Sequence, residues 1–368
     1  MQKAKKKIII SGGGTGGHIF PAIAIANGLK AKLGDVDILF IGAEDKMEME
    51  KVPKAGYPIE GLWISGFQRS LSPKNLSFPF KVISSLLKAG RIIKKFNPDL
   101  VIGVGGFASG PTLYKAAKMG IPTMIQEQNS YPGITNIILS KKVDKICVAY
   151  DNMEKHFPSE KIFLTGNPVR KEVVEIEGKR PRALEFFGLK ADKPVVLVVG
   201  GSLGARTINE AIEENLESFK ENDIQLIWQT GKGYFPKAKA ALLDLNDKGI
   251  KAYDFITEMD MAYAAADIVV SRAGAIAISE LCAVKKPIIL VPSPFVAEDH
   301  QTKNALALVT YNAAILVKDV EQKEKLMPEI MGLMENEDLR NKLKTNITSL
   351  AKNDATDAIV AVAMTLFK

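Results

Sequence analysis

Short apolar runs alternate with amphipathic stretches along most of the chain. Ten of these runs predict β-strands, at Lys7–Ile10, Asp37–Ile41, Leu100–Gly103, Pro122–Ile125, Lys145–Val148, Val195–Val199, Gln225–Trp228, Ala252–Phe255, Asp267–Val270 and Pro287–Val291. Most are continuous rather than alternating, which is typical of parallel strands that helices cover on both faces. Helical patterns lie between them, for example at Pro21–Leu33 and Arg206–Lys220. This β-α-β alternation predicts a doubly wound α/β fold.

The alternation is interrupted once, near the middle of the chain. The segment Thr165–Arg170 is followed by a charged stretch, Lys171–Arg182, before Pro194 leads into a new strand. We interpret this region as an interdomain linker. Because 368 residues exceed what one hydrophobic core usually serves, we predict two domains, residues 1–168 and residues 169–354. After Asp319 the pattern is helical, and we expect a last helix, at about 355–368, to pack back on the first domain.

The composition indicates a globular protein but does not identify its ligand. The chain is 46% hydrophobic and 25% charged, as in ordinary globular proteins, and its net charge of +7 suits nucleic acid, anionic lipid and phosphate-bearing ligands alike. Cys147 and Cys282 lie in apolar stretches and are interpreted as buried thiols in a reducing cytoplasm. With three histidines and no Cys-x-x-Cys, the sequence offers no metal-binding cluster. No apolar run reaches the roughly 18 residues of a membrane-spanning helix, so we expect any membrane contact to be peripheral.

Three glycine-rich turns follow predicted strands, at Gly12–Gly17, Gly103–Gly110 and Gly200–Gly204. Glycine permits a sharp turn and lets backbone N–H groups approach a ligand closely, and the helix that follows presents its N-terminus to an anion. One such turn is explained equally well by tight strand–helix packing. Three turns, two of them opening opposite halves of the chain as a weak internal repeat, favour a ligand held in a cleft between the domains.

A candidate base follows the first turn. The turn Gly12–Gly17 contains the G-x-G-x-x-G pattern of a dinucleotide-binding loop, with Asp35 or Asp37 as the acid expected about 20 residues later. His18 stands where the next helix begins, and a helix N-terminus favours the neutral imidazole that a general base requires. The alternative is a structural histidine bonded to the backbone.

Polar side chains gather after three other predicted strands. Glu280 lies one or two turns into a helix, where a carboxylate can bind the two vicinal hydroxyls of a ribose; a solvated helix glutamate is the alternative. Asp299–Ala305 is dense in hydrogen-bonding side chains that suit sugar hydroxyls better than hydride chemistry. Gln126–Asn129 follows a buried strand, where side chains point into the crevice of a doubly wound sheet, unless Asn129 serves only the turn.

The segment Ser72–Phe96 interleaves apolar and basic side chains and contains no acid. Its basic members are Lys74, Lys81, Lys88, Arg91, Lys94 and Lys95. This combination favours binding to the surface of an anionic bilayer. The alternative is an ordinary crossover helix that precedes the strand at Leu100.

Seven motifs occur in order along nearly the whole chain. They are Gly13–His18, Gly105–Pro111, Glu127–Asn129, Gly166–Arg170, Gly200–Arg206, Ser271–Ala275 and His300–Ala305. Each motif alone is moderately specific, but the ordered set is highly specific. Together they resemble the MurG family of bacterial N-acetylglucosaminyltransferases.

The resemblance implies a GT-B fold, in which two Rossmann-like domains face each other across a cleft, the first binding the acceptor and the second the donor. It implies an inverting hexosyltransferase that needs no metal and no cofactor. The reaction would move N-acetylglucosamine from UDP-GlcNAc to the 4-hydroxyl of undecaprenyl-pyrophosphoryl-MurNAc-pentapeptide, converting lipid I to lipid II in peptidoglycan synthesis. It further implies peripheral attachment to the cytoplasmic face of the bacterial membrane through anionic lipid, cell-wall or division membrane proteins as further partners, and no nucleic acid.

The resemblance also assigns roles to individual residues. Ser202 and Arg170 would hold the diphosphate, the main chain at Ile256 would read the uracil edge, and Glu280 would take the ribose hydroxyls. The sugar and the remaining donor groups would be contacted by Ala275, Ile276, Gln301 and Asn129. Near the acceptor diphosphate, the cleft would be lined by Thr15, Gly16 and Gly17. His18 would accept the proton of the acceptor hydroxyl.

Two positions depart from the family pattern. Near Ala277 the family often carries threonine, so a hydroxyl contact to phosphate is missing from the expected donor site. Gln126 stands where the family often has histidine, which leaves His18 as the better candidate base.

Rival functions stay open on the sequence alone. Another GT-B enzyme, such as a lipid galactosyltransferase or a UDP-sugar epimerase, is the nearest, although an epimerase has no use for Ser72–Phe96. An NAD-dependent oxidoreductase leaves Glu280 and the cluster after His300 unexplained. A membrane-bound sensor would bind UDP-GlcNAc without turnover.

Overall fold

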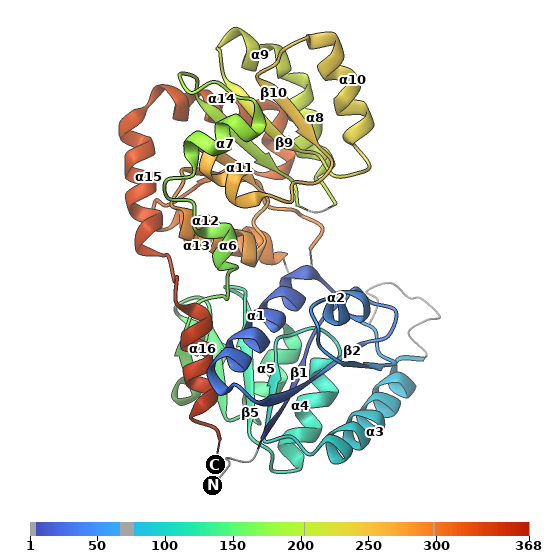
Figure 1. Ribbon diagram of the computed structural model, residues 1–368. Helices are drawn as coiled ribbons and strands as arrows, with labels where there is room; N and C mark the ends of the chain where they lie inside the picture. The colour runs from blue at the N-terminus through green and yellow to red at the C-terminus, as the bar shows by residue number, and fades with distance from the viewer. Residues whose placement is uncertain (1–4, 67–76, 202, 297–298, 368) are drawn as a thin grey trace. The chain divides into compact units, whose positions relative to one another are not determined.

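The computed structural model describes residues 5–66, 77–201, 203–296 and 299–367, which form two compact units (Figure 1). Unit 1 comprises the residues up to Pro168 together with the C-terminal segment from Asp354, and unit 2 comprises Val169–Asn353. Each unit has a parallel sheet with its own hydrophobic core.

Unit 1 contains a seven-stranded parallel sheet in the order β3-β2-β1-β4-β5-β6-β7. Its strands are β1 (Lys6–Ser11), β2 (Val36–Ala43), β3 (Ile59–Leu62), β4 (Leu100–Gly103), β5 (Thr123–Glu127), β6 (Lys145–Val148) and β7 (Ile162–Leu164). Its α-helices are α1 (Gly16–Leu33), α2 (Glu48–Lys54), α3 (Phe78–Phe96), α4 (Ser109–Lys118), α5 (Ile134–Ser140) and α16 (Ala355–Met364). Because the winding reverses between β1 and β4, the loops after these two strands meet at the carboxyl edge of the sheet.

Both faces of this sheet are buried, which explains the continuous apolar runs. Ile8 and Ile10 of β1 belong to a core shared with α1 and α16, whereas Ile9 points into a second core shared with α3, α4 and α5. The helix α16 packs directly on α1. Gly28 permits this approach, since a Cβ there would lie only 2.8 Å from Thr356 Cγ2.

Unit 2 repeats the same winding in a six-stranded parallel sheet, in the order β10-β9-β8-β11-β12-β13. Its strands are β8 (Val195–Val199), β9 (Gln225–Gln229), β10 (Ile250–Tyr253), β11 (Ile268–Ser271), β12 (Ile288–Leu290) and β13 (Ile315–Leu316). Its α-helices are α6 (Lys171–Val174), α7 (Arg180–Phe187), α8 (Arg206–Glu214), α9 (Leu216–Glu221), α10 (Phe235–Leu245), α11 (Met259–Ala265), α12 (Ala275–Val284), α13 (His300–Val309), α14 (Gln322–Glu335) and α15 (Glu337–Ser349). The switch point lies between β8 and β11.

The predicted doubly wound α/β fold is confirmed, and each of the ten predicted runs overlaps an observed strand. Three strands were missed, namely β3, β7 and β13. The helix expected over Arg206–Lys220 is interrupted at Asn215, where α8 ends and α9 follows.

The interpretation of Lys171–Arg182 as a linker was wrong. This stretch forms α6 and the start of α7, and it belongs to unit 2. Two of its charges are paired within that unit, Lys179 with Asp260 at 2.8 Å and Arg180 with Asp267 at 2.9 Å. Ion pairs that fix helices to a core look the same in sequence as the charges of a solvated linker.

Candidate active site

Two glycine loops meet at the carboxyl edge of unit 1, one after β1 and one after β4. The Gly13 N–H donates to the Gly105 carbonyl at 3.3 Å. A Cβ at Gly106, which has φ of +86°, would lie 2.4 Å from Gly13 O, so the backbones can approach this closely only without side chains. Beyond the contact, Thr15 and Gly17 are exposed and Gly16 is partly buried, so all three face solvent at the start of α1.

His18 is held by this loop. It is the third residue of α1 and is partly buried. Its Nδ1 lies 3.1 Å from the Gly13 carbonyl oxygen and 3.3 Å from Thr15 Oγ1. Because a carbonyl only accepts, Nδ1 carries the proton, and the basic lone pair of the neutral ring is on Nε2. The backbone contact considered as the structural alternative is therefore present, and it orients the ring for a general base.

Glu48 is a buried carboxylate beneath the same loop, and the sequence reasoning missed it. Only 1% of the residue is exposed. Its Oε1 accepts the Ala43 N–H at 2.9 Å and its Oε2 accepts the Gly14 N–H at 2.8 Å. The available signal was an acid at the start of a helix after β2, the strand next to β1.

Asn129 is oriented by a second buried carboxylate. Glu127 Oε1 accepts from the Asn129 backbone N–H at 3.0 Å and from its Nδ2 at 3.2 Å. The other oxygen, Oε2, accepts from the Gly133 N–H at 3.1 Å and from Asn136 Nδ2 at 2.8 Å. Glu127 thus fixes the loop that carries Asn129, which is partly buried at the end of β5.

Gln126 takes part in a buried amide network. Its Nε2 donates to Asn167 Oδ1 at 2.9 Å, and Asn167 Nδ2 donates to the Gln128 carbonyl at 2.9 Å. Gln128 in turn donates to the Val104 carbonyl at 2.8 Å. Since Gln126 is fully buried in this network, its role in the structure is to join the ends of β4 and β5 to the segment after β7.

In unit 2, Arg170 and Glu280 are in direct contact. Arg170 Nη2 lies 3.1 Å from Glu280 Oε1, with 46% of the arginine side chain and 8% of the glutamate side chain exposed. The Tyr263 hydroxyl bonds the same carboxylate. Burial raises the pKa of Glu280, and the Arg170 charge and the Tyr263 hydrogen bond oppose this rise. Arg170, the residue expected to bind the diphosphate, and Glu280, the residue expected to bind the ribose, therefore form an ion pair with each other in the structure.

Ile256 is joined to the glycine loop of unit 2 by a buried side chain that the sequence reasoning also missed. Gln229, at the end of β9, accepts the Ile256 N–H at 2.9 Å through Oε1. Its Nε2 donates to the Gly201 carbonyl at 3.0 Å. The amide N–H of Ile256 is therefore already bonded, and a nucleobase that used it would compete with Gln229. Ser202 lies outside the described residues.

The remaining predicted donor residues lie at the starts of two helices on the same edge of the sheet. Ala275 and Ile276 are the first residues of α12, where N–H groups have no partner within the helix. Gln301 Oε1 accepts the Ser293 N–H at 2.9 Å, so its side chain supports the loop after β12. Asn304, fully buried on α13, donates to the Ala273 carbonyl at 3.4 Å just before α12.

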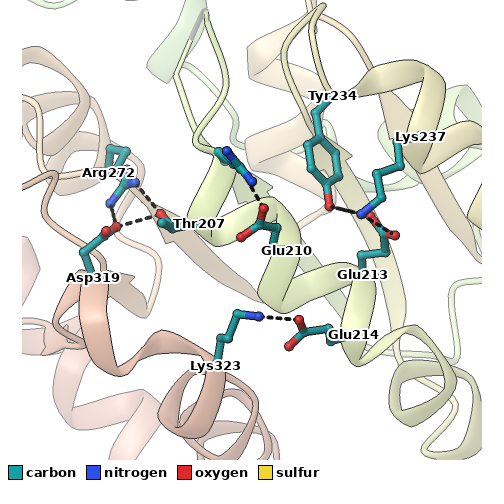
Figure 2. Close-up of polar contacts among 10 residues, drawn as sticks. Thr207, Glu210, Glu213, Glu214, Tyr234, Lys237, Arg272, Asp319 and Lys323 are labelled. Atoms are coloured by element: carbon teal, nitrogen blue, oxygen red, sulfur yellow. Dashed lines mark hydrogen bonds and ion pairs between the residues drawn. The ribbon is translucent and has the colours of Figure 1, made fainter.

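Charged side chains fix the helices that surround this edge (Figure 2). Arg272 follows β11 and donates to Asp319 and to Thr207 Oγ1, and Thr207 donates to Asp319 at 2.7 Å. Along α8, further pairs join Lys323 to Glu214 and Lys237 to Glu213. Only 13% of the Arg272 side chain is exposed, so this arginine of the Ser271–Ala275 motif stabilises the loop ends rather than facing solvent.

The helix α3 exposes an apolar face on unit 1. Phe80, Ile83 and Leu87 follow one another at helical spacing and are 69%, 57% and 53% exposed. The opposite face packs into the core through Ala89 and Ile93. The helix is therefore anchored on one side and presents large apolar side chains on the other.

The basic residues of this segment fall into two groups. Lys81 donates to Ser65 Oγ and Lys88 pairs with Glu44, each at 2.9 Å. Residues 72–76 lie outside the described part of the chain. The exposed basic residues are Arg91, Lys94 and Lys95.

Comparison with known families covers both units. Residues 8–148 match the N-terminal domain of glycosyltransferase family 28, and residues 195–361 match its C-terminal domain.

The chain is also similar to named relatives over nearly its whole length. It is 57% identical over 354 residues to the UDP-N-acetylglucosamine–N-acetylmuramyl-(pentapeptide) pyrophosphoryl-undecaprenol N-acetylglucosamine transferase of Cytophaga hutchinsonii, which covers 96% of this chain and 95% of that protein. It is 53% identical over 356 residues to the protein of the same name from Parabacteroides distasonis, covering 97% of each.

Solved structures also match this chain over nearly its whole length. The crystal structure of Acinetobacter baumannii MurG matches with a TM-score of 0.80 and 28% identity, over 98% of this chain and 99% of that one. A UDP-GlcNAc 2-epimerase from Neisseria meningitidis matches with a TM-score of 0.68 at 14% identity, over 98% of this chain and 100% of that one, and shares the fold alone.

Proposed function

This chain belongs to glycosyltransferase family 28, and from that premise we propose that it transfers N-acetylglucosamine from UDP-GlcNAc to the 4-hydroxyl of undecaprenyl-pyrophosphoryl-MurNAc-pentapeptide. The product is lipid II, the lipid-linked disaccharide precursor of peptidoglycan. The observation that carries the proposal is identity above 50% across about 96% of the chain with transferases named for this reaction.

Unit 2 is assigned to the donor. Glu280 takes the ribose hydroxyls, and Arg170, which pairs with Glu280 in the structure, turns to the diphosphate. The first N–H groups of α12, at Ala275 and Ile276, add the positive end of a helix dipole to the same anion. The main chain at Ile256 reads the uracil. Two further expected contacts complete the set, Ser202 to the diphosphate and Gln301 to the sugar.

Unit 1 is assigned to the acceptor and to proton transfer. The acceptor oxygen attacks the anomeric carbon while the bond from that carbon to the UDP oxygen breaks on the opposite face, so the configuration inverts. The hydroxyl proton passes to Nε2 of His18, whose Nδ1–H is held by Gly13. Asn129 contacts the sugar, and Thr15, Gly16 and Gly17 lie toward the acceptor diphosphate.

The membrane contact is assigned to α3. In the part of the chain that the structure describes, no helix combines the length and apolarity needed to cross a bilayer. Phe80, Ile83 and Leu87 are exposed on a helix whose exposed cations follow one to two turns later, an arrangement that suits the headgroup region of an anionic membrane. The protein then works at the cytoplasmic membrane face, where its lipid-linked acceptor resides.

UDP release from UDP-GlcNAc, measured with and without a lipid-linked muramoyl acceptor, tests the function. Acceptor-dependent release with formation of the disaccharide lipid is the expected result. Binding of UDP-GlcNAc without turnover would instead indicate a sensor, and conversion of UDP-GlcNAc to its 2-epimer would indicate an epimerase. Either result overturns the proposal.

A further inference from the structure

We propose that Glu48 is a positioning residue for His18 and acts through a single peptide unit, the one between Gly13 and Gly14. The proposal deepens the proposed function, because it rests on His18 as the base.

The link between the two side chains is continuous. Glu48 Oε2 accepts the N–H of Gly14 at 2.8 Å. The carbonyl of the same peptide unit belongs to Gly13, and its oxygen accepts from His18 Nδ1 at 3.1 Å. In a trans peptide the N–H and C=O point in opposite directions, so the carboxylate and the imidazole sit at the two ends of one dipole.

The surrounding atoms leave this peptide little freedom. On one side, a Cβ at Gly13 would lie 2.2 Å from Glu48 Cδ, and a Cβ at Gly42 would lie 2.5 Å from Glu48 Cγ. On the other side, a Cβ at Gly106 would lie 2.4 Å from Gly13 O. The glycines therefore let a buried carboxylate and the loop after β4 close on the two faces of the same peptide.

The charge of Glu48 has a direct consequence for His18. A carboxylate that accepts the N–H polarises the peptide and makes its carbonyl oxygen a stronger acceptor. The stronger acceptor holds the proton of His18 on Nδ1, which keeps the lone pair on Nε2, the nitrogen that must take the acceptor proton. The arrangement does for His18 what a carboxylate bonded directly to a catalytic histidine does, with a peptide unit between them.

Glu48 also affects which backbone groups are available for phosphate. The Gly14 N–H is already bonded to an anion, so an acceptor diphosphate at this loop must use N–H groups further along, at the start of α1. Those groups include Gly16 and Gly17, the residues expected near that diphosphate.

The tautomer of His18 is the first test, and it uses the wild-type protein. The chain has three histidines, so ¹⁵N-histidine labelling gives a spectrum in which His18 is assigned by its loss in His18→Ala. We expect the ¹⁵N shifts of neutral His18 to show the proton on Nδ1. A proton on Nε2 overturns the proposal whether or not any variant folds.

Glu48→Gln is the second test. The amide keeps the shape of the side chain but accepts from only one of the two N–H groups and carries no charge. We expect part of the His18 population to move to the Nε2–H tautomer and kcat to fall about 10- to 100-fold, by analogy with the loss of the hydrogen-bond partner of a metal-ligating histidine. The KM for UDP-GlcNAc should stay within about twofold, because the residues assigned to the UDP group lie in unit 2.

Glu50→Gln on the same helix is the matched control, since the Glu50 side chain is 60% exposed and pairs with Lys54. The proposal fails if Glu48→Gln folds and matches Glu50→Gln in both kcat and His18 tautomer. Wild-type protein that shows the Nδ1–H tautomer but no transfer to the lipid acceptor would overturn the proposed function and leave the geometry intact.

Discussion

Replacing Glu280 with glutamine removes the charge of a buried carboxylate while keeping its shape. The residue is 6% exposed, and its oxygens face Arg170 and Tyr263. If this carboxylate binds both ribose hydroxyls, glutamine keeps one neutral acceptor and loses one charge-assisted hydrogen bond. The expected weakening of UDP binding is about 1.5–3 kcal/mol, which corresponds to about a 10- to 150-fold rise in Kd.

Alanine would be a poorer test than glutamine. Tyr263 is 4% exposed and hydrogen-bonds Glu280, so Glu280→Ala leaves a buried hydroxyl without its partner. That loss alone destabilises the fold by about 1–3 kcal/mol. Glu280→Gln avoids it, because the amide still bonds the hydroxyl.

The pH dependence of stability gives an independent check on Glu280. Burial raises its pKa above the ordinary value of about 4.3, so the folded protein holds the proton to a higher pH than the unfolded chain does. The wild type therefore loses stability as pH rises from that value through the folded pKa, and the glutamine variant does not. Chemical unfolding measures this difference: the free energy of unfolding of the variant, relative to that of the wild type, should be higher at pH 7 than at pH 4.

Calorimetry with UDP and 2′-deoxy-UDP separates ribose recognition from general damage. In the wild type the missing hydroxyl should weaken binding, and in Glu280→Gln the penalty should shrink. Glu217→Gln, at a side chain 69% exposed in unit 2, is the matched control. If the two nucleotides differ by the same factor in wild type and Glu280→Gln, Glu280 does not bind that hydroxyl.

Three further perturbations address the other assigned residues. His18→Ala should lower turnover about 10²–10⁴-fold with UDP affinity unchanged; a loss below tenfold with chemistry rate-limiting would remove His18 from the role of base. Phe80→Ser combined with Leu87→Ser should weaken co-sedimentation with anionic vesicles and spare activity on a short-chain soluble acceptor, and unchanged binding would exclude α3 as the contact. Gln229→Glu should raise the KM for UDP-GlcNAc more than Gln229→Leu does, because it adds an anion beside the glycine loop; equal values would contradict this.

The strands that are buried on both faces could be predicted from the sequence, whereas three of the strands at the sheet edges could not. β1 carries three consecutive isoleucines because each side of it is a core. The missed strands lack this signal: β3 and β7 are the two edges of their sheet, and β3 contains Glu60 and Gly61. β13 is an edge strand of only two residues. An edge strand has one neighbour and less to bury, so its residues look like those of a loop.

The candidate site was predictable as a set of backbone positions but not as a set of contacts. Glycine turns and the residues after them mark where ligands approach a doubly wound sheet. The contact of Glu48 with Gly14 spans 34 residues, and those of Gln229 with Gly201 and Ile256 span 28 and 27. Such contacts depend on how neighbouring strands align, which the spacing of residues along the chain does not specify.

In each unit a buried side chain bonds the glycine loop after the first strand of the unit, but the two side chains differ in charge. β2 and β9 hold equivalent places in their sheets, and a buried side chain at or just after each one bonds the glycine loop of the first strand: Glu48 in unit 1 and Gln229 in unit 2. Glu48 accepts a loop N–H and brings a negative charge, which opposes phosphate there and suits a loop that holds a base. Gln229 donates to a loop carbonyl at Gly201 and brings no charge, so it occupies no N–H group of that loop. The difference between one carboxylate and one amide thus fits proton transfer in unit 1 and diphosphate binding in unit 2.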